Sequence, residues 1–459
     1  MFELWHSKNP HSWFSVSEKN GFLPVGKPIK KNLFGYEKIN EILDMMKLST
    51  SDSLLENNNL AKYVDEHLPL YDVSQEINNQ TISCLFRDYC FLASAYSLET
   101  SHYHLEDGKY GIARDELPPN IAIPLTILGE KLDTNPWLCY AYGYGLNNAV
   151  VKEGALNLGD YRSYETIRMF NGHDSESGFI NVHVAMNSYT PELVSVQQKI
   201  LESAHLKKTD DLKYFLNKHY YLLNSIIDSL NLMWKACKRS DYLSFRTFIM
   251  GQKGNKDMYP SESIIYNYGN NMEMKCFRGE TGAQDSIIPS VDNLFQIKYP
   301  RNQLTEYLYD LREYRPKDHQ AYIEYNAEMS KQVELIDLIK TCPECSLALL
   351  KNLNCIRLFR SKHWNLTKKY IIENTNHPVA TGGTPITTWL PNQLGATLET
   401  MEDLITSLNL QRSLLNDENR NEYLTIKLEV NERLMKIIDE VSELQKDFKD
   451  QNHNTFLER

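Results

Sequence analysis

The stretch Asn354-Cys-Ile-Arg-Leu-Phe-Arg-Ser-Lys-His363-Trp-Asn-Leu-Thr-Lys-Lys-Tyr370-Ile predicts a helix with a histidine on its apolar face. The apolar residues recur at the spacing of one helix face, at Leu349, Leu353, Ile356, Phe359, Leu366 and Tyr370. His363 lies between Phe359 and Leu366 on this face, so its imidazole is expected to point inward. A neutral imidazole among apolar side chains is a suitable proximal ligand for haem iron. The alternative is a hydrogen-bonded core histidine, which is the more frequent role of an inward imidazole.

Further short blocks accompany this helix along the chain. They are Leu117-Pro-Pro-Asn-Ile-Ala-Ile-Pro124, Leu138-Cys-Tyr-Ala with Leu146-Asn-Asn148, Arg246-x-Phe-x-x-Gly-x-Lys-Gly-Asn255, and Arg278-Gly-Glu-Thr-Gly-Ala-Gln284 followed by Asp292. Together with Arg360-Ser-x-His363 and Thr381-Gly-Gly-Thr384, they resemble the indoleamine 2,3-dioxygenase family and follow its order. One such motif is weak, whereas several in register are a strong signal.

The resemblance and the helical periodicity together predict a mainly α fold. Residues 1–116 are expected to form a small N-terminal domain, α or α+β, and residues 117–397 a helical domain that binds haem and carries catalysis. Residues 398–459 are expected to form a C-terminal helical extension beyond the resemblance. Periodic apolar residues predict helices over 82–98, 179–187, 212–238, 304–311 and 321–340. The proline-rich stretch 117–124 is expected to be a linker or the entry to the large domain, and 251–268 and 278–290 are expected to be ordered loops.

The C-terminal extension carries a narrow apolar seam among charged residues. Its members are Leu434, Ile437, Val441, Leu444 and Phe448. Two interpretations stay open: the helix packs back on the domain, or it pairs with a second copy in a homodimer.

Composition limits the classes of partner. The chain has 459 residues with 49 Lys plus Arg against 60 Asp plus Glu, a net charge of −11. This balance argues against nucleic-acid binding, which requires clustered positive charge. The sequence shows neither a signal peptide nor an apolar run that could span a bilayer, so we expect a cytoplasmic protein with no membrane partner.

The eight cysteines are scattered and predict no disulfide framework. Cys342 and Cys345 form the one close pair, but no second pair or histidines stand at zinc-site spacing. We interpret these two as incidental, with a redox role as the minor alternative.

The resemblance assigns the cofactor residues. It implies haem b with iron on His363 and molecular oxygen as co-substrate. Arg360, one helical turn before His363, is expected near a haem propionate, and Asp292 is expected to pair with this arginine. An ordinary salt bridge is the alternative for the pair.

The resemblance also places residues around an indole substrate. Arg246 stands in an apolar, aromatic stretch and is expected to bind the amino-acid carboxylate, with a protein carboxylate as the alternative partner. The loop with Thr381, Gly382 and Thr384 is expected to close over the amino-acid end. Tyr140 is expected at the substrate as well.

Phe179 is expected to pack on the indole. His183, four residues later on the same helical face, stands where the resembled enzymes usually have serine. The related tryptophan 2,3-dioxygenases place a histidine near the indole nitrogen, so His183 is the candidate distal residue. A surface or core histidine is the alternative.

Departures from the family's pattern leave the substrate open. Asp241 and Tyr242 replace a pair of phenylalanines, and Tyr140, Tyr142 and Tyr144 crowd one region. An extra carboxylate and several phenols suit a hydroxylated or otherwise modified indole. The leading hypothesis is therefore a haem dioxygenase that converts L-tryptophan or a related indoleamine to N-formylkynurenine. The alternatives are a haem oxygenase of secondary metabolism, as in the pyrrolnitrin-type relatives, acting on a modified indole or phenolic amino acid, and a haem-binding sensor without catalysis.

Overall fold

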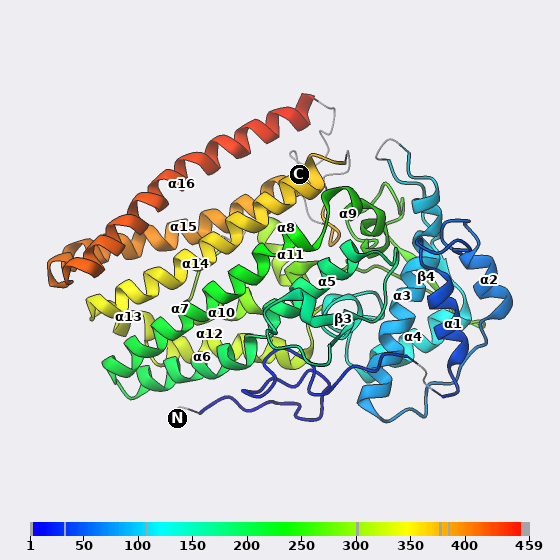
Figure 1. The fold of residues 1–459 in the computed structure, drawn as a ribbon, viewed down its shortest axis with the longest axis horizontal. Helices are drawn as coiled ribbons and strands as arrows, with labels where there is room; N and C mark the ends of the chain where they lie inside the picture. The colour runs from blue at the N-terminus through cyan, green and yellow to red at the C-terminus, as the bar shows by residue number, and fades with distance from the viewer. Residues whose placement is uncertain are drawn as a thin grey trace.

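The computed structural model describes residues 3–31, 34–106, 109–299, 303–375, 379–383 and 386–450, without the side chains of 303–305, 308, 386–392 and 437–450. Helices dominate these residues, and the strands are few and short, which confirms the mainly α prediction (Figure 1). One end of the molecule is a stack of long helices; the other holds the first helices and the short strands.

The N-terminal part of the chain forms most of the smaller half of the molecule. Its helices are α1 (Glu37–Met45), α2 (Leu60–His67), α3 (Asn79–Tyr103) and α4 (Pro119–Lys131). Two small sheets join them: β1 (Glu116–Leu117), β4 (Ile264–Asn267) and β5 (Met272–Lys275) in the order β1-β4-β5, and the antiparallel pair β2 (Ala149–Val151) and β3 (Tyr164–Thr166). A π-helical turn, η1 (Tyr140–Tyr144), packs on α3.

The larger half is helical. It comprises α5 (Asp174–Asn187), α6 (Thr190–His205), α7 (Thr209–Asn231), α8 (Met233–Ala236), α9 (Arg239–Arg246), α10 (Ile287–Leu294), α11 (Gln303–Arg312), α12 (Lys317–Gln332), α13 (Leu335–Lys340), α14 (Pro343–Thr367), α15 (Ile386–Gln411) and α16 (Asp417–Asp450). Short 3₁₀ turns lie at η2 (Tyr161–Ser163), η3 (Thr247–Ile249), η4 (Gly282–Gln284) and η6 (Arg412–Leu414). Helix α14 packs extensively against α7 and α15 and continues into a π-helical turn, η5 (Lys368–Ile372).

The segment before α1 crosses to the larger half. The Trp5 amide donates to Gln198 of α6 at 3.0 Å, and the Val16 amide donates to Asp318 of α12 at 2.6 Å. These contacts tie the first residues of the chain to helices of the larger half. The predicted domain boundaries at 116/117 and 397/398 stay predictions.

Several sequence predictions need correction. Residues 117–124 are no linker, because Leu117 ends β1 and Pro119 begins α4, where a missing N–H costs no helical hydrogen bond. The predicted loop 251–268 contains β4, and the predicted loop 278–290 contains η4 and the start of α10. The helix predicted over 321–340 breaks before Leu335, where Glu334 adopts a left-handed conformation with φ 50°.

The long tail helix packs back on the domain through its first half. Tyr423, Ile426 and Val430 of α16 are buried, and Leu434 is partly buried against the core. Arg357 of α14 forms an ion pair with Glu429 at 2.6 Å. The side chains of Ile437, Val441, Leu444 and Phe448 lie outside the described residues, so helix pairing through them stays a prediction.

No described helix combines the length and the apolar character that crossing a bilayer requires. The described residues hold no cluster of three or more His, Cys, Asp or Glu arranged to bind a metal ion. Cys342 instead caps α14, with its Sγ accepting from the Cys345 amide at 3.4 Å.

Candidate active site

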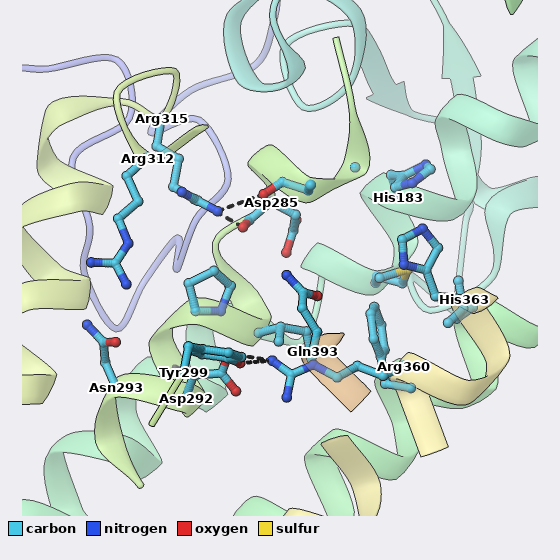
Figure 2. Close-up of a pocket in the computed structure, with 17 residues that line it drawn as sticks. His183, Asp285, Asp292, Asn293, Tyr299, Arg312, Arg315, Arg360, His363 and Gln393 are labelled. Carbon is cyan, nitrogen blue, oxygen red and sulfur yellow. Dashed lines mark hydrogen bonds and ion pairs between the residues drawn. The ribbon is translucent and has the colours of Figure 1, made fainter. Parts of the chain in front are cut away.

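A cavity with two lobes lies between α5, α10 and α14. Both lobes share four lining residues: His183, Leu230, Gly282 and His363. We call the first the polar lobe; it has a cavity volume of about 120 Å³ and is lined further by Asp285, Asp292, Tyr299, Arg312, Arg315 and Arg360 (Figure 2). We call the second the aromatic lobe; it has a cavity volume of about 120 Å³ and is lined further by Phe179, Tyr242, Glu280, Thr281, Tyr370 and Thr381.

His363 projects from the last turns of α14 into this cavity. No described residue forms a hydrogen bond with its ring. Burial, and then the nearby His183, lower the pKa of His363 to about 4, so the imidazole is neutral near pH 7. A neutral ring with an uncommitted nitrogen is what a haem iron requires.

His183 projects from α5 toward the same space. Its Nδ1 lies 2.9 Å from the carbonyl oxygen of Phe179, and since a carbonyl only accepts, Nδ1 carries the proton. Nε2 is therefore a hydrogen-bond acceptor. Nε2 faces Gly282, and a Cβ atom at this position would lie only 3.3 Å from Nε2. The glycine therefore keeps the approach to Nε2 open. Burial lowers the pKa of His183, which favours the neutral ring.

Charged side chains line the polar lobe. Arg360 forms an ion pair with Asp292 at 2.6 Å, and the Tyr299 hydroxyl donates to the same carboxylate (Figure 2). Among the described residues, the Arg360 Nε and the Asp292 Oδ1 have no hydrogen-bond partner. The sequence prediction had paired Arg360 with Asp292, and the structure brings them together.

Arg315 is a second cation of this lobe that sequence reasoning missed. It is buried and donates to the carbonyl oxygens of Asp285 and Ala283, while its Nη1 finds no hydrogen-bond partner in the part of the chain that the structure describes. Burial, and then the nearby Arg312, lower the pKa of Arg315 to about 10, while the charge of Asp285 opposes this shift. A buried guanidinium in this state favours an anionic ligand. No motif in the sequence indicated that Arg315 would line the cavity. Its place there is set by the fold, which brings the residues after α11 to the polar lobe.

Arg246 lies behind the aromatic lobe, at the end of α9. Its guanidinium is fully buried and donates to the Tyr110 hydroxyl at 3.0 Å and to the Val379 carbonyl. Its Nε has no partner, and no described carboxylate pairs with it. The alternative of a protein carboxylate as partner therefore finds no support among the described residues.

The segment 379–383 packs tightly on the cavity. Arg278 Nη1 donates to the Gly382 carbonyl at 2.8 Å, and Thr381 lines the aromatic lobe. Gly383 has φ +80°, and a side chain there would overlap the Lys253 carbonyl, so only glycine fits this approach. Thr384, predicted at the substrate, lies outside the described residues.

The remaining predicted residues divide between the lobe and its surroundings. Phe179 lines the aromatic lobe and packs on His183, Tyr242 and Phe245. Tyr140 does not line either lobe; its ring packs edge-on against His183, and its hydroxyl donates to Asp285 at 2.8 Å. Asp241 binds the hydroxyls of Ser175 and Ser240 outside the cavity, so it is not the extra pocket carboxylate that the sequence suggested.

The carboxylate that does line the aromatic lobe is Glu280. It is 2% exposed, and no described residue forms a hydrogen bond or ion pair with it. Burial raises the pKa of Glu280 to about 8. The sequence motif Arg278-Gly-Glu-Thr contained this residue, but nothing in it indicated that the side chain would be buried without a partner.

Comparison with known sequences identifies this arrangement. The sequence profile of indoleamine 2,3-dioxygenase matches residues 10–454. The chain belongs to the indoleamine 2,3-dioxygenase family. It is therefore a haem-dependent oxidoreductase of the dioxygenase type. The match extends through all of α16, so the C-terminal helix does not lie beyond the family resemblance, contrary to the sequence prediction.

Relatives share low identity over long alignments. Human indoleamine 2,3-dioxygenase 2 is 25% identical over 418 residues, covering 84% of this chain and 94% of the human protein. Indoleamine 2,3-dioxygenase of Saccharomyces cerevisiae is 23% identical over 384 residues, covering 79% and 80%. A 6-hydroxytryptophan 2,3-dioxygenase of Fusarium equiseti is 22% identical over 275 residues, covering 57% and 65%.

The walls of the cavity fit the haem of this family. The neutral His363 supplies an iron ligand, and the unsatisfied guanidinium atoms of Arg315 and Arg360 suit the negative propionates. His183 and Gly282 leave a polar but uncrowded space near His363.

The buried Glu280 predicts a specific pH dependence of stability. Its folded-state pKa of about 8 exceeds the ordinary value of 4.5, so the folded protein holds the proton more tightly. The contribution of this group to the free energy of unfolding is fully present below about pH 4.5, and it is lost as the pH rises through about 8. Glu280→Gln removes this loss, so the urea midpoint of the variant should exceed that of wild type increasingly across this window. The exposed Glu66→Gln is the control, and a parallel pH profile in wild type and Glu280→Gln would contradict the assignment.

Proposed function

We propose that this enzyme cleaves the indole C2–C3 bond of L-tryptophan or a related indoleamine, giving N-formylkynurenine, with haem b held on His363. When bound, the haem supplies the binding and activation of molecular oxygen. The observation that carries the proposal is that His183 and His363, from different helices, face one cavity with an aromatic lobe. Arg315 and the Arg360–Asp292 pair would hold the propionates.

His183 orients the indole in this proposal. Its Nε2 accepts the hydrogen bond from the indole N–H, because Nδ1 is already committed to the Phe179 carbonyl. Phe179 packs on the indole face. Tyr140 does not contact the substrate in this proposal. Its ring packs against His183, and its hydroxyl donates to Asp285. The role of Tyr140 is thus to position His183 at the substrate.

Arg246 and the 379–383 segment hold the amino-acid end. The substrate carboxylate supplies the negative charge that the buried Arg246 lacks. Thr381 and Gly382 close this end and exclude water, which strengthens the charged contact. Holding the substrate in one orientation lowers the entropic part of the barrier.

Family membership favours an enzyme over the haem-binding sensor. The buried cation at Arg246 agrees, because a gas sensor has no need to bind a carboxylate. The choice between plain and modified indoles depends on the aromatic lobe.

The decisive test of the proposed function is a spectral titration of the ferrous holoenzyme with L-tryptophan under nitrogen, followed by oxygen. We expect the haem spectrum to shift with tryptophan and N-formylkynurenine to form after oxygen is admitted. His363→Ala should lose haem while His67→Ala, at an exposed histidine, should retain it. Full haem occupancy in His363→Ala would disprove the ligand assignment, and a shift without product would disprove the reaction.

Arg246→Leu tests the carboxylate contact. A charge-assisted hydrogen bond contributes about 1.5–3 kcal/mol, so the KM for tryptophan should rise about 10- to 100-fold. Tryptamine lacks the carboxylate, and its weaker KM should stay nearly unchanged in the variant. An equal loss for both compounds would show that Arg246 only holds the loop through Val379.

His183→Ser tests the contact to the indole nitrogen. Wild type should prefer L-tryptophan over 1-methyltryptophan, whose ring nitrogen has no hydrogen to donate. Losing one buried hydrogen bond should reduce this preference about 10-fold in kcat/KM, while haem content stays the same. An unchanged preference would place His183 away from the indole nitrogen.

A further inference from the structure

Glu280 is a buried carboxyl to which the proposed reaction gives no role. It is 2% exposed, it lines the aromatic lobe, and it has no hydrogen-bond or ion-pair partner among the described residues. Buried polar groups are nearly always paired, because an unpaired one has given up water without compensation. A carboxyl in this state in a cavity wall indicates a ligand group that pairs with it.

The backbone around Glu280 packs against the segment that closes the amino-acid end of the substrate. A Cβ atom at Gly279 would lie 2.4 Å from the Thr381 carbonyl oxygen. A Cβ atom at Gly382 would lie 3.1 Å from the Thr281 Cγ2. The residues on both sides of Glu280 therefore contact the closing segment, and Thr381 lines the same lobe as Glu280.

The same backbone also packs against the chain that follows Arg246. The Cβ position of Gly279 lies 2.4 Å from the Ile249 carbonyl oxygen, and Arg246 precedes Ile249 by three residues. The Arg246 guanidinium in turn donates to the Val379 carbonyl of the closing segment. Arg246 and Glu280 thus belong to two segments in direct contact, and both segments contact the one that closes the amino-acid end.

Tyr242 of the aromatic lobe lies within the influence of both charges. Burial raises the pKa of Tyr242, and after burial the charge of Arg246 lowers it and the charge of Glu280 raises it. Arg246 and Glu280 nevertheless form no ion pair with each other. Two opposite buried charges that are held near one phenol but apart from each other suit a ligand that carries both charges.

The nearest cation along the chain does not pair with Glu280. Arg278, two residues earlier, forms an ion pair with Asp310 at 2.7 Å and donates to the Gly382 carbonyl at 2.8 Å. Since no other described cation pairs with Glu280 either, its counter-charge has to come from the ligand.

We propose that Glu280 binds the α-ammonium group of the substrate and makes the enzyme select amino acids over analogues that lack this group. This inference rests on the proposed function, in which Arg246 binds the α-carboxylate. Both groups are attached to one carbon, so a substrate held at Arg246 presents its ammonium group at the same end of the lobe. An ammonium group donates to a carboxyl oxygen whether the carboxyl is protonated or ionised, and the contact favours the ionised form.

The test compares L-tryptophan with indole-3-propionic acid, which is the same molecule without the amino group. Calorimetric titration of the wild-type ferrous holoenzyme under nitrogen should give a Kd for L-tryptophan about 10- to 100-fold below that for indole-3-propionic acid, because the latter makes no charge-assisted hydrogen bond to Glu280. Glu280→Leu should abolish this preference. Glu280→Gln, whose amide oxygen still accepts but carries no charge, should retain part of it.

The Kd for indole-3-propionic acid separates binding from a structural role. It should stay unchanged or fall in Glu280→Gln, since this compound has no group for the carboxyl, whereas the Kd for L-tryptophan should rise. Arg246→Leu should weaken both compounds alike, because both carry the carboxylate. Asp241→Asn is the matched control: it changes a carboxylate outside the cavity, so it should keep the wild-type preference.

The preference within one variant does not depend on the fraction of folded protein. Equal Kd values for the two compounds in wild type, or a preference that survives Glu280→Leu, would overturn the inference. An equal loss for both compounds in Glu280→Gln would also overturn it, by showing that Glu280 only supports the fold. A preference that depends on Glu280 without turnover of L-tryptophan would support the inference and overturn the proposed reaction instead.

Discussion

A buried hydrogen bond between α7 and α14 fixes the register on which the cavity depends. His219 Nδ1 of α7 donates to Asn352 Oδ1 of α14 at 2.6 Å, and the Asn352 amide donates back to the Leu216 carbonyl at 2.9 Å. Burial lowers the pKa of His219 to about 4, so the ring stays neutral in this contact. His363 follows Asn352 by about three helical turns, so sliding or rotating α14 would turn the imidazole away from the cavity.

Unpaired buried charge is the common feature of the proposed ligand contacts. Among the described residues, neither Arg315 in the wall of the polar lobe nor Arg246 behind the aromatic lobe forms an ion pair, and Glu280 in the wall of the aromatic lobe has no hydrogen-bond or ion-pair partner. Isolated buried charges destabilise a fold, so their grouping around one cavity is difficult to explain by packing. A haem with two propionates and an amino acid with a carboxylate would supply partners for these two arginines.

The helices with clear periodicity were predictable, and their ends were not. The predicted helix over 82–98 lies within α3, which extends to Tyr103, because the apolar pattern marks only the most buried turns. The break before Leu335 depends on the conformation of Glu334, which no apolar pattern encodes. Strand β4 was missed because its four residues, Ile264–Asn267, are too few to show a clear period of two.

The sequence by itself determined the family, the mainly α fold and an inward-facing His363, because these depend on local periodicity and on short motifs in fixed order. It also anticipated the pairing of Arg360 with Asp292. Only the tertiary structure decided that Arg315 lines the polar lobe, that Asp241 faces away, and that Glu280 is buried without a partner. Burial and pairing arise from segments distant in the chain, so no single stretch of sequence contains them.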